Sequence, residues 1–326
     1  MWGDRGPSGL KTVAWELCIA LAAVAGVGAG YLLSESGTTA RYPSNVPEKI
    51  AELPPGPKTD LIRYGRDLVE DTPRLIGKGA QNPALAYGGN NLSCQNCHLN
   101  GGLRPFAAPF VSTAASFPML VDNRAIALHD RINSCVRLGL NGKPLPEDGR
   151  EMAALIAYIE FIGKDTPEGV RLPGSGLMPI ALPSELPSAR RGVTVYAQHC
   201  QSCHGQNGEG ARKLPPEIGY YVPPLWGEAS FNGGAGMGQI AYAASYIRAN
   251  MPIGVDHENP VLSVQEAWDV AAYMIVHPRP IAPAQGPAEP MIIEELPVSP
   301  PPDAAGGPPV QEFVPDRTPR PANAGP

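Results

Sequence analysis

A pattern of two cysteines and a histidine occurs twice in this chain and constrains it more than any other feature. It reads CQNCH at residues 94–98 and CQSCH at residues 200–204. Two thiols three positions apart on one helical turn reach the two vinyl groups at one edge of a haem, and the adjacent histidine then projects toward the iron. The sequence therefore predicts two covalently bound haem c groups, attached and ligated by Cys94, Cys97, His98, Cys200, Cys203 and His204.

Two other uses of paired cysteines are less compatible with the sequence. A structural zinc site would need all four thiols within one domain, whereas the two pairs here are about a hundred residues apart. A thioredoxin-like dithiol would need a strand-rich surrounding, and no convincing alternating strand pattern appears. Haem attachment remains the stronger interpretation.

The composition limits both fold and function. The 326 residues carry a net charge of -6, which excludes a generic nucleic-acid binder. Glycine (37) and proline (39) together exceed a fifth of the chain, so long loops must connect its regular elements. The fold class expected is mainly α, with two tandem cytochrome c-type domains that are helical and rich in loops.

The chain divides into five segments. Residues 1–40 contain an apolar, uncharged stretch from Leu17 to Leu33 preceded by basic residues, which predicts export to the periplasm as a cleaved signal or a retained membrane anchor. Residues 41–170 and 188–277 are the expected domains, separated by a linker at 171–187. Residues 278–326 hold 15 prolines in 49 residues and are expected to be a disordered tail.

The two domains are a distant repeat in the order of their elements. Each begins with an amphipathic helix containing a glycine, at Leu61–Val69 and Ala189–His199. Each ends with a helix opened by a capping-box pattern. The capping pairs are Asp148 with Glu151 and Ser263 with Glu266, and the helices stop at Gly163 and before Pro278.

Each iron needs a sixth ligand or an open position. In the second domain Met251 follows His204 by 47 residues, and a thioether suits a haem that only passes electrons. Met237 is the rival ligand, and a third alternative is that both methionines only pack.

In the first domain Met119 and Met152 lie off the corresponding position, but Cys135 stands 37 residues after His98. We expect a helix from Asn123 to Leu138 that places Leu128, Arg131 and Cys135 on one face. A thiolate ligand lowers the haem potential, which suits a haem where substrate chemistry occurs. The alternatives are that Cys135 is a buried free thiol, or that His129, which would point away from it, is the ligand.

Positive charge gathers around the first motif. Residues 94–143 contain five basic and two acidic residues, a net of +3, whereas residues 200–251 contain three of each. A local cationic surface on an acidic protein favours a small anion at the first haem. Arg131 and Arg104 are the candidate substrate contacts, and the alternative for either is an ordinary solvated arginine.

Several runs of residues resemble one family. They are NLSCQNCH at 91–98, RPF at 104–106, DRINSC at 130–135, NGKPL at 141–145, FNGGAGM at 231–237 and NMP at 250–252. These runs resemble the dihaem thiosulfate dehydrogenases related to the SoxA cytochromes, over residues 42–277. The resemblance implies that Cys135 is the axial thiolate of the active-site haem and that Met251 ligates the second haem. Some relatives have a switchable lysine before that methionine, where this chain has Asn250.

The resemblance further implies a reaction. Two thiosulfate ions would be joined into tetrathionate with release of two electrons, or tetrathionate reduced in the reverse direction, and an external acceptor such as a small cytochrome c would take the electrons. We add the hypothesis that Cys135 leaves the iron so that its sulfur engages a substrate sulfur. The competing class is a non-catalytic dihaem electron carrier, a subunit of a membrane redox complex, which has little use for a low-potential thiolate haem.

Overall fold

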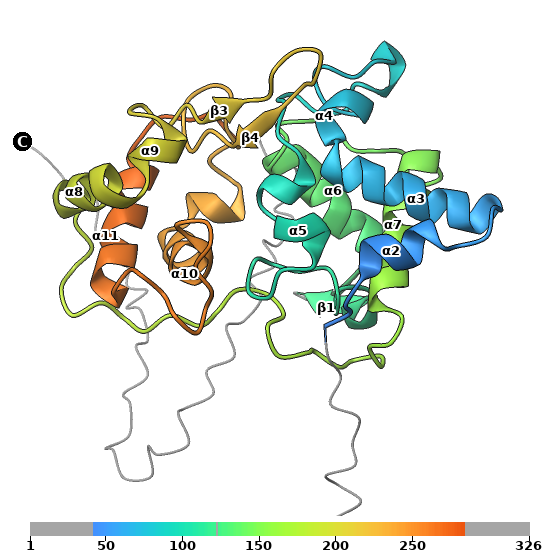
Figure 1. The fold of residues 1–326 in the computed structure, drawn as a ribbon, viewed down its shortest axis with the longest axis horizontal. Coiled ribbons are helices and arrows are strands. Elements are labelled where there is room, and N and C mark those ends of the chain that lie inside the picture. The colour runs from blue at the N-terminus through green and yellow to red at the C-terminus, as the bar shows by residue number, and fades with distance from the viewer. Residues whose placement is uncertain (1–41, 122, 284–326) are drawn as a thin grey trace, which may run out of the picture.

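The structure of this chain is a computed structural model that describes residues 42–121 and 123–283 (Figure 1). These residues form mainly helices joined by long loops, which confirms the expected fold class. No helix within the described ranges is both long enough and apolar enough to cross a membrane. The apolar stretch Leu17–Leu33 lies outside those ranges.

The first half of the chain is organised around the crossing of α3 (Pro57–Glu70) and α7 (Arg150–Gly163). A Cβ atom on Gly65 would lie 2.0 Å from the carbonyl oxygen of Ala154, so only glycine lets the two helices approach this closely. The other helices of this half are α2 (Val46–Ala51), α4 (Thr72–Leu75), α5 (Leu99–Gly102) and α6 (Leu128–Leu138), with 3-10 turns η1 (Pro83–Leu85), η2 (Cys94–Asn96) and η3 (Ala114–Ser116).

The second half repeats that crossing with α8 (Ala189–His199) and α11 (Val264–Ile275). Here a Cβ atom on Gly192 would lie 2.1 Å from the carbonyl oxygen of Asp269. The matching glycines agree with the repeat expected from the sequence. The remaining helical elements are α9 (Gln201–His204), η4 (Gly236–Gly238) and α10 (Ile240–Asn250).

Of the two predicted capping boxes, one is present. At α11 the Ser263 hydroxyl accepts from the Glu266 amide at 3.2 Å, and the Glu266 carboxylate accepts from the Ser263 amide at 2.9 Å. The predicted capping box of Asp148 with Glu151 is wrong. Helix α7 starts at Arg150 after Gly149, and no side chain caps it. Glu151 is buried and accepts from the Tyr64 hydroxyl at 3.0 Å, so it serves helix packing instead.

The helix that carries Cys135 is shorter than expected. It begins at Leu128, not Asn123, because Arg124–Ile126 (β2) pairs antiparallel with Met119–Val121 (β1). A second small ribbon pairs Ala211–Arg212 (β3) with Tyr220–Val222 (β4). Strands of two or three residues are too short to produce an alternating pattern in the sequence, which explains why they were not expected.

Each half has its own buried core, but the first core extends across the chain. Tyr220, Phe231 and Ala235, from the second half, are buried against residues such as Leu68 and Met152. The second core gathers residues of α8, α10 and α11. Figure 1 shows α10 on the side of the second domain that faces α5. The two halves therefore share packed surface as well as a linker.

The linker and the start of the tail are both attached to the domains. In the linker, the Ala181 carbonyl accepts from the Trp268 indole at 2.9 Å. In the tail, the Pro278 and Pro280 carbonyls accept from the amides of Gly227 at 2.8 Å and Gly233 at 3.0 Å. The predicted disordered tail is thus bound to the second domain over residues 278–283, and residues 284–326 lie outside the described part of the chain.

Candidate haem sites

The first cysteine motif is built on the short turn η2 and the residues that follow it. The Cys94 amide donates to the Thr72 hydroxyl at 3.0 Å, which anchors the turn to α4. The Nδ1 atom of His98 lies 2.6 Å from the carbonyl oxygen of Ala108. A carbonyl at this distance favours a proton on Nδ1, so Nε2 is left with a lone pair for a metal.

Helix α6 brings Cys135 to this motif. The Nη1 atom of Arg131 lies 3.4 Å from the Cys135 sulfur, as expected for two residues one turn apart on one face. Burial alone would raise the pKa of the Cys135 thiol, but Arg131 and a hydrogen bond with His98 lower it to about 7. Burial raises the pKa of Cys94 to about 11 and that of Cys97 to about 12, each also affected by Cys135. Cys135 and Arg131 therefore lie beside Cys94, Cys97 and His98.

Arg104, the other candidate substrate contact, makes its side-chain hydrogen bonds with the second half of the chain. Its Nε atom donates to the Asn250 side-chain oxygen at 3.1 Å, and its Nη2 atom donates to the Val255 carbonyl. Both partners flank Met251, in the second half of the chain. These two contacts direct the guanidinium to the boundary between the two sites, whereas Arg131 faces the first site directly.

The second motif lies where α8 meets α9: Cys200 stands between the two helices, and Cys203 and His204 lie on α9. The His204 Nδ1 atom lies 3.0 Å from the Pro223 carbonyl, an arrangement equivalent to that of His98. Burial lowers the pKa of His204, which favours the neutral imidazole that binds metals. Cys203 is exposed, so this motif lies at the protein surface.

The two candidate methionines have different surroundings. Met251 is the C-terminal cap of α10, where its amide donates to the Ile247 carbonyl at 2.8 Å. Met237 lies in η4 and packs against the first core. The packing of Met237 against the first core gives it a structural role.

His129 does not share the surroundings of Cys135. Its Nε2 atom lies 3.5 Å from an Asp130 oxygen and 3.7 Å from a Glu147 oxygen. The Asp130 carboxylate also accepts from the Ala127 amide at 2.9 Å, which caps α6. This environment on the outer face of the helix agrees with the expectation that His129 points away from Cys135.

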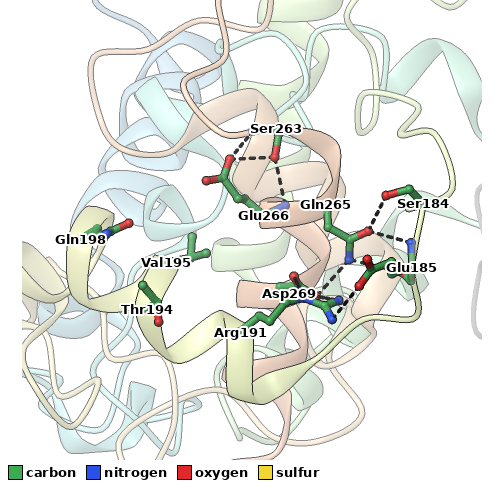
Figure 2. Close-up of a pocket in the computed structure, with 10 residues that line it drawn as sticks. All are labelled: Ser184, Glu185, Arg191, Thr194, Val195, Gln198, Ser263, Gln265, Glu266 and Asp269. Carbon is green, nitrogen blue, oxygen red and sulfur yellow. Dashed lines mark hydrogen bonds and ion pairs between the residues drawn. The ribbon is translucent and has the colours of Figure 1, made fainter.

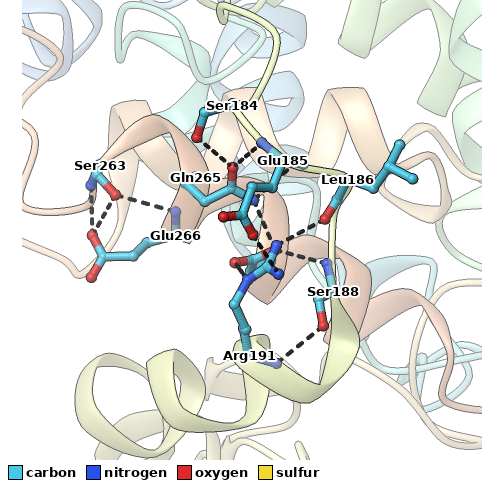
Figure 3. Close-up of polar contacts among 9 residues, drawn as sticks. Ser184, Glu185, Leu186, Ser188, Arg191, Ser263, Gln265 and Glu266 are labelled. Atoms are coloured by element: carbon cyan, nitrogen blue, oxygen red, sulfur yellow. Dashed lines mark hydrogen bonds and ion pairs between the residues drawn. The ribbon is translucent and has the colours of Figure 1, made fainter.

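An open pocket of about 530 Å³ lies away from both motifs, between the linker and helices α8 and α11 (Figure 2). Figure 3 shows hydrogen bonds and ion pairs among several of its polar side chains. Arg191 donates to Asp269 at 2.6 and 2.8 Å and forms an ion pair with Glu185 at 3.0 Å. The Gln265 oxygen accepts from the Ser184 hydroxyl and from the Glu185 amide. These contacts fasten the linker to the second domain.

The donors present at both motifs fit haem c. Cys94, Cys97, Cys135, Cys200 and Cys203 are all free thiols, available for thioether bonds or for ligation. Both adjacent histidines are oriented by a backbone carbonyl on Nδ1, the outer contact that fixes a metal-binding imidazole. The carbonyls of Ala108 and Pro223 were not identified from the sequence, because a backbone group leaves no residue-type signal.

Comparisons with known proteins identify the family of this chain. The cytochrome c family matches residues 189–275. The chain is 38% identical over 237 residues to a thiosulfate dehydrogenase of Allochromatium vinosum, covering 71% of this chain and 83% of that protein. It is 35% identical over 246 residues to one of Thiomonas intermedia, covering 75% and 73%. A solved thiosulfate dehydrogenase of Marichromatium purpuratum aligns with a TM-score of 0.66 and 32% identity, over 78% of this chain and 52% of that one. The chain therefore belongs to the thiosulfate dehydrogenase family and carries a cytochrome c domain.

Proposed function

We propose that this protein is an enzyme that oxidises two thiosulfate ions to one tetrathionate and passes the two released electrons to an external acceptor. The observation that carries this proposal is the meeting of Cys135 with the first cysteine motif beside Arg131. The names of its relatives supply the substrate. The reverse reaction, tetrathionate reduction, uses the same groups.

The residues divide into two ligand sets. Cys94 and Cys97 would attach the first haem, with His98 and Cys135 as its axial ligands. Cys200 and Cys203 would attach the second haem, with His204 and Met251 as its axial ligands. Each haem, when bound, supplies reversible one-electron chemistry, so two of them match the two electrons of the reaction.

The protein side of the first site binds an anion. Thiosulfate is a dianion, and the +3 balance of residues 94–143 offsets the acidity of the whole chain. The Arg131 guanidinium faces the Cys135 sulfur and is placed to hold a negatively charged sulfur compound there. His98 and Arg131 both stabilise the thiolate form of Cys135.

The second site suits electron exit. Cys203 is exposed, whereas both cysteines of the first motif are partly covered, so a partner can approach the second haem edge more closely. We propose a small cytochrome c or another external carrier as the acceptor, in the periplasm. Residues 1–40 would deliver the chain there as a signal or anchor, and the two domains would span residues 41–170 and 188–277.

The test is a steady-state assay of thiosulfate-dependent reduction of an artificial acceptor, with tetrathionate measured as the product. We expect two thiosulfate ions consumed per tetrathionate. A holoprotein that carries both haems and shows no thiosulfate-dependent reduction would contradict the proposal and favour a non-catalytic carrier.

A further inference from the structure

A five-residue segment, Arg104 to Ala108, contacts both candidate haem sites. It follows the first motif in the chain, and its polar groups reach in two directions. Toward the first site it holds the proximal histidine, and toward the second it holds the loop that contains Met251. The Tyr246 hydroxyl of α10 adds a parallel contact by donating to the Cys97 carbonyl at 2.9 Å.

Backbone geometry fixes the segment on the first-site side. Phe106 and Ala108 have φ angles of 59° and 48°, a left-handed conformation that is costly for residues other than glycine. Linker carbonyls hold both residues, because their amides donate to Gly174 at 2.7 Å and Gly176 at 3.0 Å. The Ala108 carbonyl is thereby aimed at the His98 Nδ1 atom.

On the second-site side the contacts converge on Asn250 and Val255. The Asn250 amide group donates to the Phe106 carbonyl at 3.0 Å, and its oxygen accepts from Arg104 at 3.1 Å. Asn250 is 1% exposed, so its side chain depends on these partners. Arg104 also binds the Val255 carbonyl. One guanidinium therefore fastens the residue before Met251 and a residue four positions after it.

The loop that follows α10, residues 251–261, makes its other described polar contacts mostly within itself. Ile253 in this loop is 78% exposed, and the polar residues Asp256, Glu258 and Asn259 bond mainly to one another. The ring of Phe106 meets that of His257 at 4.6 Å, and this contact also comes from the 104–108 segment. The first domain thus supplies the main anchors of the Met251 loop.

We propose that Arg104 is a positioning residue for Met251, holding the methionine of the second site from the first domain. The inference rests on the proposed ligation by Met251. It gives Arg104 a role different from a substrate contact. Loss of the guanidinium would free this loop and make the methionine easier to displace, while leaving Cys135 and Arg131 in place.

The test uses the full-length holoprotein with Arg104→Ala, Arg104→Lys and Asn250→Ala. In the first measurement, imidazole is added to each protein, and its binding to the second haem is monitored by the loss of the methionine–iron absorption band. In the second, amide hydrogen exchange is measured over residues 253–259. We expect imidazole to displace the methionine about tenfold or more readily in Arg104→Ala, as for a lost charge-assisted contact. Exchange of the loop amides should be faster, and the first-haem spectrum should not change. Arg104→Lys, which keeps one contact at most, should fall between.

Arg63→Ala is the matched control. Arg63, on α3, also binds one side-chain oxygen, that of Asp60, and one carbonyl, that of Leu53. It should leave both readouts at the wild-type value. If Arg104→Ala and Asn250→Ala show the same imidazole displacement and the same amide exchange as the wild type, the role of Arg104 is overturned, and the proposed function is not affected. If Met251→Gly keeps the band, the ligand assignment fails first and the inference fails with it.

Discussion

Arg131 and Cys135 face each other on α6, with Nη1 3.4 Å from the sulfur, beside the first cysteine motif. A cation in this position does two things. It lowers the pKa of the thiol, with His98, to about 7 despite burial, and it presents positive charge where an anionic sulfur compound would arrive. The consequences can be tested one residue at a time.

Cys135→Gly should abolish thiosulfate oxidation while both haems stay attached, because attachment uses Cys94 and Cys97. The low-spin thiolate features of the first haem should disappear from the spectrum. Turnover and spectra of the purified holoprotein would measure this. Retention of full turnover would assign Cys135 a structural role and support the non-catalytic carrier.

Arg131→Ala should raise the KM for thiosulfate by about tenfold to a hundredfold, as for the loss of one contact to a charged group. Added salt should raise the wild-type KM in the same direction, since screening weakens the attraction of a dianion. Arg150→Ala is the control. Arg150 lies on α7, and its guanidinium carbon is 4.6 Å from the centre of the Tyr64 ring. An equal rise in KM for Arg150→Ala would show a general charge effect and not a binding contact.

Intact mass and haem staining of a denaturing gel should reveal two covalently bound haems per chain. The reason is that each motif supplies two free thiols and one oriented histidine. The double variant Cys200→Ala/Cys203→Ala should retain one haem, on the first domain. Wild-type protein with a single haem would contradict the assignment of two attachment sites.

Met251→Gly should lower the potential of the second haem, because a thioether ligand favours ferrous iron. Potentiometric titration of both haems would measure the change, and delivery of electrons to the acceptor should slow. Met237→Gly is the comparison. It removes packing from the first core and should cost stability, but the methionine–iron band should remain. Loss of the band in Met237→Gly alone would reverse the assignment.

Asp269→Asn should lower the free energy of unfolding of the second domain by about 1 kcal/mol above about pH 4. The effect is this small because Arg191 is partly exposed, so solvent screens its ion pair with Asp269. Burial would raise the pKa of Asp269, but bonds from Arg191, the Ser188 amide and Gln265 lower it below its usual value. Because the pKa of Asp269 is lower in the folded protein than in the unfolded chain, where it is about 3.9, the ionised carboxylate stabilises the fold above that pH. This stabilisation is lost as the pH falls through the folded-state pKa.

Denaturant unfolding at several pH values, followed by tryptophan fluorescence, would measure this contribution of Asp269. The wild type should lose stability as acid protonates Asp269, and Asp269→Asn should lack that part of the pH dependence. A parallel pH dependence in the two proteins would show that the carboxylate does not act in this way.

Local patterns in the sequence predict α8, the capping box of α11 and the shared helix face of Arg131 and Cys135. The bounds of α8 and the Ser263 cap follow from hydrophobic periodicity and capping chemistry, which act within a few residues. The shared face of Arg131 and Cys135 follows from helix geometry, even though the predicted helix began at Asn123 and the observed one begins at Leu128. The predicted helix face is correct because it depends only on the spacing of the two residues inside the helix.

What the sequence could not predict depends on contacts between distant segments. The bond from Arg104 joins it to a residue 146 positions away, and no local pattern marks such a pair. Asp148 and Glu151 fit a capping box, but Glu151 instead accepts a hydrogen bond from Tyr64, 87 residues away in the chain. The carbonyls of Ala108 and Pro223 act through backbone shape, which residue type does not encode.

The contacts of Asn250 also limit how far the second domain is an interchangeable module. An excised fragment of residues 188–277 would keep its cysteine motif and Met251, but the buried Asn250 amide would lose the Phe106 carbonyl. Phe231, buried in the first core, would be exposed to water. A recombinant second domain would therefore give a poor measure of the haem potential in the whole protein, and transplanting this domain into another cytochrome would require the 104–108 segment to travel with it.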